Sequence, residues 1–197
     1  MSEESHKVSA SSFPLAVAVG LVAFAAYALA AAPAAYSLDS AELAAATFGL
    51  GVAHPPGEET TLLWGRIFCL LPFGTMAFKV ALGQAVAGAI AAVLVYYLVL
   101  AAGAELAVTS TLRPLVRELL AAAAALAFAF APGVVIVCDR PEVYATQTAL
   151  SLGAILVALR ANDDRRPLLL AAFLIAIGVG NHSLIAGLVG LGAVTCA

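Results

Sequence analysis

Residues 13–57 read FPLAVAVGLVAFAAYALAAAPAAYSLDSAELAAATFGLGVAHPPG, and this stretch decides how the chain folds. It opens with an apolar run, Phe13 to Ala35, that is long enough to cross a bilayer, which takes about 20 residues. Two carboxylates, Asp39 and Glu42, follow directly. Acidic groups at a membrane boundary are unfavourable unless they are solvated, paired or used. The stretch therefore predicts a membrane protein whose functional residues lie in the loop after its first span.

The composition supports a membrane protein and excludes several other classes. Of the 197 residues, 63% are hydrophobic and only 11% are charged, and the mean hydropathy is +1.05. A soluble domain with this balance could not cover its surface with polar groups. The net charge of −3 gives no sign of nucleic-acid binding. The three cysteines have no metal-type spacing, so unpaired thiols are expected rather than a disulfide framework.

The remaining sequence predicts an all-α, polytopic bundle. The first apolar run exceeds the core of a signal peptide, so we expect a retained anchor helix after a polar tail at 1–12. Residues 13–197 then form one membrane domain, and the apolar C-terminal end leads us to expect a truncated chain. Pro132 and Gly133 should kink or end the third span. The sequence predicts about five spans, at 14–36, 79–101, 117–137, 142–160 and 168–197.

The basic residues predict the orientation, because Lys and Arg concentrate on the cytoplasmic side. A cytoplasmic N-terminus puts six basic residues inside (Lys7, Arg113, Arg117, Arg160, Arg165 and Arg166) and three outside (Arg66, Lys79 and Arg140). Residues 37–78 are then a long external loop. Within it, 38–50 and 60–71 read as two short interfacial helices, with Trp64 as an anchor. We expect a multi-pass protein of the bacterial inner membrane or an equivalent membrane.

Asp39 and Glu42 are three residues apart, so a helix places them on one face. There they could hold a cation, or one could accept a proton from a nucleophile while the other orients it. The same spacing also fits an N-cap aspartate with a glutamate that reaches back to it. It recurs at Asp139 and Glu142, with Pro141 suited to a first helical turn. The spacing alone favours capping slightly, and the two roles are compatible.

Three further residues on the external side are candidate phosphate or sugar ligands. His54 precedes a stiff Pro-Pro-Gly turn and could donate to a phosphate or bind a metal. Arg66 and Arg140 are cations that could bind a phosphate. Each has a simpler interpretation, since a histidine in a turn is more often structural and single arginines are more often headgroup anchors.

Polar residues in the apolar segments form the last group of candidates. Asn181 and His182 interrupt the last span and should face protein or water. Gly178 and Gly180 before them could let the helix open. A packing hydrogen bond between helices is an equally good explanation for the pair. Glu142 and Tyr144 stand at the start of the fourth span, whose polar end should sit in a cavity or at the interface.

Four segments in order, LDSAELAAATFGLGVAHPPG, WGRIFCLLPFG, PEVYATQTAL and GVGNHS, resemble the domain of unknown function 2723. This family of polytopic membrane proteins includes the transmembrane protein 260-like O-mannosyltransferases. The resemblance covers about residues 14–190, as the N-terminal part of a longer protein. It departs from the family at Ala41, where many members have glycine, and at Glu58 and Glu59, where small or apolar residues are commoner.

The resemblance implies a C-type glycosyltransferase fold and a sugar donor carried on a polyprenyl phosphate. It also implies an essential acidic residue in the first external loop, and Asp39 occupies that place. Glu42 joins it as a catalytic candidate. The expected substrate or phosphate ligands are His54, Arg66, Arg140, Glu142, Tyr144, Asn181 and His182. The acceptor would be a protein or glycan hydroxyl, and a divalent metal is allowed but not required.

Two other classes of protein remain open at this stage. A transporter or channel subunit would also place Glu142, Asn181 and His182 in the membrane, although the sequence contains no inverted repeat. A non-catalytic membrane remnant would keep the helices but lack a complete site. The glycosyltransferase hypothesis makes a sharper prediction, that Asp39, His54, Glu142 and the Asn181–His182 pair line one outward-facing cleft.

Overall fold

The computed structural model describes residues 12–35, 39–55, 58–105, 111–161 and 165–196. The polar tail predicted at 1–12 therefore lies almost wholly outside the described residues, as do Pro56 and Gly57 of the Pro-Pro-Gly turn. Every regular element in the described part is an α-helix, which confirms the all-α prediction. These helices are α1 (Ser12–Ala30), α2 (Ser40–Gly49), α3 (Glu59–Cys69), α4 (Met76–Glu105), α6 (Pro114–Ala129), α7 (Pro132–Cys138), α8 (Tyr144–Ala158) and α9 (Arg166–Cys196).

Three helices, α1, α4 and α9, are long and apolar enough to cross a membrane, and the chain is an integral membrane protein. The pair α6 and α7 makes a fourth candidate span, bent by 66°. The bend falls at Pro132, the first residue of α7, as the sequence predicted. The segment predicted at 142–160 is helical, but α8 has only 15 residues. It is about 22 Å long, which is shorter than the hydrocarbon core.

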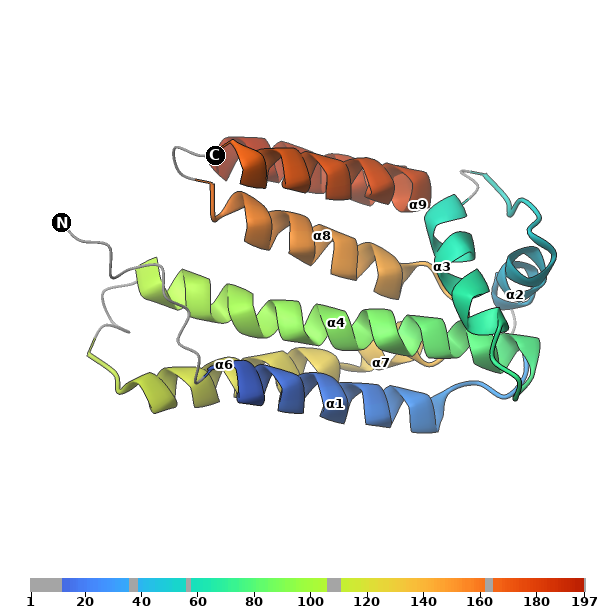
Figure 1. Cartoon of the computed structure of the whole chain (residues 1–197), viewed down its shortest axis with the longest axis horizontal. Helices are drawn as coiled ribbons and strands as arrows, with labels where there is room; N and C mark the ends of the chain where they lie inside the picture. The colour runs from blue at the N-terminus through green and yellow to red at the C-terminus, as the bar shows by residue number, and fades with distance from the viewer. Residues whose placement is uncertain (1–11, 36–38, 56–57, 106–110, 162–164, 197) are drawn as a thin grey trace.

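Helix α9 meets the length test but reverses direction at His182, whose backbone (φ −151°, ψ 91°) is not helical. A Cβ built on Gly190 would lie 3.4 Å from Ile175 Cγ2. In a straight helix these residues would be about 22 Å apart. Residues 166–181 and 183–196 therefore form an antiparallel hairpin (Figure 1). Here the structure differs from the single span predicted at 168–197, because hydropathy records an apolar run but not its direction.

The long helices lie side by side with α4 at the centre, where it packs against α1, α6 and α8 (Figure 1). Small side chains allow this close packing. A Cβ on Gly88 of α4 would collide with Cys138 Sγ of α7. The buried Tyr27 hydroxyl of α1 donates to the Ala129 carbonyl of α6 over 2.7 Å. This hydroxyl therefore has a hydrogen-bond partner inside the bundle.

The two short helices predicted in the first long loop are present as α2 and α3, and they cover one end of the bundle (Figure 1). Trp64 of α3 donates its indole N–H to the Gly83 carbonyl of α4 over 2.8 Å. It therefore fastens α3 to the bundle, whereas Leu63 and Ile67 on the other face are exposed. The turn of the α9 hairpin lies at the same end and contacts α3.

Candidate active site

Asp39 lies immediately before α2, at the N-cap position, but its carboxylate makes no capping hydrogen bond. Only its backbone carbonyl acts at the helix start, accepting from the Leu43 N–H over 2.8 Å. The Asp39 side chain is 56% exposed. The capping interpretation of the Asp39–Glu42 pair is thus wrong for both side chains, since Glu42 also points elsewhere.

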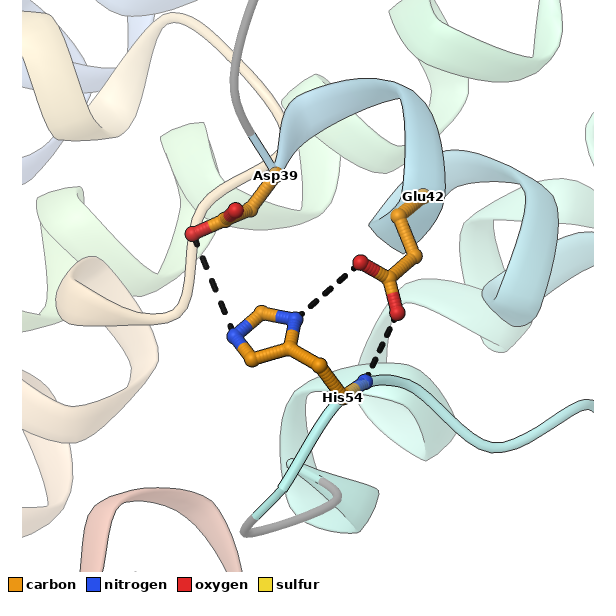
Figure 2. A group of neighbouring side chains, drawn as sticks. All are labelled: Asp39, Glu42 and His54. Atoms are coloured by element: carbon orange, nitrogen blue, oxygen red, sulfur yellow. Dashed lines mark hydrogen bonds and ion pairs between the residues drawn. The ribbon is translucent and has the colours of Figure 1, made fainter.

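Glu42 holds the loop that carries His54 against the start of α2 (Figure 2). One carboxylate oxygen accepts the His54 backbone N–H over 2.7 Å. The other lies 3.1 Å from the ring Nδ1. Because both oxygens of one carboxylate engage one residue, Glu42 fixes the position of the loop and also the orientation of the imidazole.

The second ring nitrogen, His54 Nε2, faces two more carboxylates. It lies 4.0 Å from Asp39 Oδ2 and 3.8 Å from Glu58 Oε1. Glu58 precedes α3 with a left-handed backbone (φ 59°) that is unusual for a residue other than glycine. Its side chain is only 7% exposed, and its Oε2 is buried without a hydrogen-bond partner.

Sequence reasoning missed Glu58 as a site residue. Glu58 was noted only as a departure from the family pattern. The signal that could have found it is its separation from His54 in the sequence, four residues with two prolines between them. The structure places Glu58 Oε1 3.8 Å from His54 Nε2.

The crowding of carboxylates sets the electrostatics of this loop. The hydrogen bond with Glu42 is the main cause that raises the pKa of His54 above its ordinary value of 6.5, and the charges of Glu58, Glu42 and Asp39 add to it. Burial is the main cause that raises the pKa of Glu58; the charge of His54 opposes it, and the charges of Asp39, Glu142 and Glu42 add to it. Burial and then the charge of Asp39 raise the pKa of Glu142, whereas Arg140 opposes them.

We expect the His54 ring to titrate above pH 6.5, and Glu42→Gln to lower its midpoint. A raised pKa means that the ionic part of the His54–Glu42 contact is complete below pH about 6.5 and is lost as the pH rises through the folded-state pKa. The chain has three histidines, so their NMR ring signals can be assigned by single substitutions. The titration is done with a chelator present, and a midpoint at or below 6.5 that Glu42→Gln leaves unchanged would contradict this electrostatic account.

Glu142 lies in the connection between α7 and α8, close enough to Asp39 and Glu58 to shift the pKa of Glu58 and to be shifted by Asp39. The second predicted capping pair, Asp139 with Glu142, is wrong. Asp139 follows the last residue of α7, while Val143 is the N-cap of α8. Asp139 instead pairs with Arg140, Oδ1 to Nε, over 2.9 Å.

Asn181 is fully buried at the turn of the α9 hairpin and joins three elements. Its Oδ1 accepts the Thr61 backbone N–H of α3 over 3.0 Å. Its Nδ2 donates to the Val143 carbonyl over 3.1 Å and to Gln147 Oε1 over 3.2 Å. For Asn181 the structure thus shows the packing hydrogen bonds of the simpler interpretation. They hold the starts of α3 and α8 beside the α9 turn.

His182 packs against Tyr144, with the ring centroids 5.8 Å apart. Its Nδ1 is buried and has no hydrogen-bond partner. The side chain therefore keeps a ring nitrogen available next to an exposed phenol. Among the predicted phosphate ligands, His182 is one that has a ring nitrogen without a hydrogen-bond partner.

Arg66 contacts the far end of α2 instead of Asp39. Its guanidinium donates to the Phe48 carbonyl oxygen and lies over the Phe48 ring, 5.6 Å from the centroid. A cation at a helix C-terminus is favourable there. The structure gives Arg66 a helix-capping contact, and a role in phosphate binding stays a prediction.

The predicted site residues therefore gather at one end of the bundle, in two groups. Asp39, Glu42 and His54 form one group with Glu58, and Tyr144, Asn181 and His182 form the other. A cavity of about 280 Å³ lies nearby, at the break between α6 and α7, and Tyr144 contributes to its lining. None of the other predicted site residues is among the residues that line this cavity. One cleft shared by both groups thus stays a prediction.

The first group also has the composition of a cation site. One ligand atom from each of Asp39, Glu42 and His54 can be chosen so that all lie within 4.8 Å of one another. Carboxylate oxygen and imidazole nitrogen suit divalent metals such as Mn²⁺ and Zn²⁺. The sequence left the metal open, and this geometry is compatible with one.

Fold and site together define a polytopic helical membrane protein with a carboxylate–histidine cluster directly after its first span. The family described as "Protein O-mannosyl-transferase TMEM260 N-terminal domain" matches residues 39–196. The chain belongs to this family, which confirms the resemblance of the four sequence segments.

A mouse (Mus musculus) relative named "Protein O-mannosyl-transferase TMEM260" is 48% identical over 62 residues. That match covers 31% of this chain and 9% of the relative, so the chain matches less than a tenth of that relative's length. No solved structure matches the chain.

Proposed function

We propose that this chain carries the catalytic loop of a membrane glycosyltransferase. It would transfer a sugar from a polyprenyl-phosphate donor to an acceptor hydroxyl at the extracytoplasmic face. The observation that carries the proposal is the carboxylate of Asp39, which is exposed, makes no cap and faces His54 directly after the first span. The activity for which the family is named, protein O-mannosyl transfer, supports mannose as the sugar and a protein hydroxyl as the acceptor.

Asp39 is the general base in this proposal. The acceptor oxygen attacks the anomeric carbon of the sugar while its proton passes to the Asp39 carboxylate. The bond between the anomeric carbon and the phosphate oxygen breaks at the same time, and the phosphate keeps the electron pair. A base within hydrogen-bond reach of such a proton typically contributes about 10²–10⁴-fold to the rate.

The leaving phosphate needs donors or positive charge beside it. His182, with its unpartnered Nδ1, and Arg140, next to Glu142, are the side chains that we assign to this contact. Glu42 positions His54 and so keeps the ring beside Asp39. A donor anchored in lipid would reach this end of the bundle from the membrane, leaving its polyprenyl tail among the apolar helices.

The proposal requires the loop at 37–78 to be external. We expect Glu59→Cys to react with a membrane-impermeant maleimide in intact cells, because Glu59 is exposed and the basic residues favour a cytoplasmic N-terminus. Ser40 is buried and is unsuitable for this labelling. The unsubstituted chain reports the background from its own cysteines. Labelling that appears only after permeabilisation would place the loop on the other side and remove the proposed face.

The donor class can be tested by mass spectrometry of lipids that co-purify with the chain in mild detergent. We expect a polyprenyl phosphate bearing one hexose, enriched over a control membrane protein from the same cells. Recovery of phospholipids only, from membranes that contain the carrier lipid, would contradict the proposal. It would favour the transporter or the non-catalytic alternative.

A further inference from the structure

The cluster beside Asp39 holds more negative charge than its described partners offset. Four carboxylates influence one another there, from Asp39, Glu42, Glu58 and Glu142. The cations described close to them are the His54 ring and Arg140, and Arg140 is also paired with Asp139. Like charges in a partly buried site are unfavourable unless a cation or protons offset them.

The orientation of the His54 ring indicates where such a cation would bind. Glu42 accepts at Nδ1 over 3.1 Å, which favours the tautomer with the proton on Nδ1. In that neutral tautomer the lone pair is on Nε2, the ring nitrogen that lies 4.0 Å from Asp39 Oδ2 and 3.8 Å from Glu58 Oε1. A carboxylate that holds the distal nitrogen of a metal-binding histidine is the usual outer partner of such ligands.

The distances from His54 Nε2 to the two carboxylates fit one ion. The Asp39 side chain must shift toward Glu58 to share it, because the group whose ligand atoms all lie within 4.8 Å of one another comprises Asp39, Glu42 and His54 without Glu58. Nε2 lies 4.0 Å from Asp39 Oδ2 and 3.8 Å from Glu58 Oε1. Two ligands of one cation with bonds of about 2.1 Å lie roughly 3–4 Å apart. The Glu42 carboxylate accepts the His54 backbone N–H and contacts the ring Nδ1, which fixes the ring, while the exposed Asp39 side chain can move toward the ion.

Glu58 supplies the independent observation. Its side chain is more than nine-tenths buried and points at Nε2, yet its Oε2 has no hydrogen-bond partner. A buried carboxylate oxygen without a hydrogen-bond partner is unfavourable, and the contact of Oε1 with His54 leaves Oε2 unsatisfied. Its neighbour in sequence, Glu59, is exposed, so acidity of the segment alone does not explain the burial of Glu58.

We propose that His54 Nε2, Asp39 and Glu58 bind one divalent cation of the Mn²⁺ or Zn²⁺ class, with Glu42 orienting the histidine. Such an ion satisfies the buried Glu58 and places positive charge beside the base. Its use in catalysis rests on the proposed function, where it would stabilise the leaving phosphate while Asp39 keeps one oxygen for the acceptor proton. Binding of the ion does not depend on that function.

The test is Mn²⁺ binding to the purified chain in detergent, measured by electron paramagnetic resonance titration. We expect one saturable site, weakened at least about tenfold by Glu58→Gln and by about 10–100-fold by Glu42→Gln. Glu59→Gln is the matched control and should bind within about twofold of the unsubstituted chain. Absence of a saturable site, or equal affinity in Glu58→Gln and Glu59→Gln, would overturn the proposal.

Nitrogen coupling in the electron paramagnetic resonance spectrum tests whether a histidine binds the ion, even if one of the carboxylate variants folds poorly. Nitrogen coupling to bound Mn²⁺ should appear in the unsubstituted chain and in His182→Gln, and disappear in His54→Gln. Coupling that persists in His54→Gln would assign the ion to another site and overturn the proposal.

The outcomes for the ion and for the transfer reaction are separable. Mn²⁺ binding at this cluster without any sugar transfer would leave the cation site standing and contradict the proposed function. Sugar transfer that a chelator leaves unchanged, together with no Mn²⁺ binding, would support the proposed function and contradict the cation site. The chelator experiment uses the same preparation as the titration, so the two results refer to one sample.

Discussion

Replacing Asn181 by leucine is expected to lower the free energy of unfolding by about 2–4 kcal/mol. Leucine is similar in size but removes the three hydrogen bonds that Asn181 makes to Thr61, Val143 and Gln147. Their donors and acceptors would then be buried without partners, each at a cost of roughly 1–3 kcal/mol, with water at the bundle end recovering part of it. The corresponding fall in melting temperature is about 4–16 °C for a chain of this size.

The control for this prediction is Leu184→Ala, three residues further along the hairpin. Leu184 is 67% exposed, so its truncation should change the free energy of unfolding by less than about 0.5 kcal/mol. Both variants are compared by thermal unfolding in the same detergent. Equal melting temperatures for the two would show that Asn181 does not hold α3, α8 and α9 together.

The position of Asn181 also connects stability with the site. Thr61, its partner on α3, stands in the first turn of that helix, two residues after its first residue and three after Glu58. Thr60 adds a second bond, from its hydroxyl to the Ile177 carbonyl over 2.8 Å. Loss of the Asn181 contacts should therefore loosen Glu58 as well, and Asn181→Leu should weaken Mn²⁺ binding.

Composition alone was enough to predict the fold class. A chain this apolar must satisfy its backbone polar groups internally, and helices do so within a single segment. The positions of α1, α4 and the Pro132 bend followed from hydropathy and from proline geometry. The reversal at His182 did not, because residues 166–196 stay apolar on both sides of the turn. The pair of glycines at 178 and 180 was the local hint, but it does not distinguish an opened helix from a hairpin.

Part of the site was predictable from the sequence of the loop after the first span. Asp39, Glu42 and His54 were recognisable from the loop and are close together in the structure. The D-x-x-E spacing could not distinguish a cap from a cluster, because both need the two residues on one helical face. A tertiary contact distinguishes the two: the His54 backbone N–H donates to one Glu42 carboxylate oxygen, and the His54 ring contacts the other. The burial of Glu58 is also tertiary, since its side chain lies beside His54 and is close to Asp39 and to Glu142, which comes from a distant part of the chain.

Asp39→Asn is expected to reduce sugar transfer by about 10²–10⁴-fold, the usual contribution of a general base. The fold should be nearly unaffected, with a change of less than about 0.5 kcal/mol in the free energy of unfolding. The side chain is half exposed and makes no capping bond that could be lost. Asparagine keeps the shape of aspartate but cannot accept the acceptor's proton. Transfer rates and melting temperatures of the variant and the unsubstituted chain are measured on the same preparations.

The most direct measurement of the central claim is the mass of an acceptor peptide after incubation with the chain in nanodiscs. The nanodiscs contain polyprenyl-phosphate mannose, and the peptide carries one serine or threonine. The account predicts a peptide heavier by one hexose with the unsubstituted chain and with Glu59→Gln, and an essentially unmodified peptide with Asp39→Asn. Equal modification by Asp39→Asn and the unsubstituted chain, or no modification by any of the three folded proteins, would contradict it.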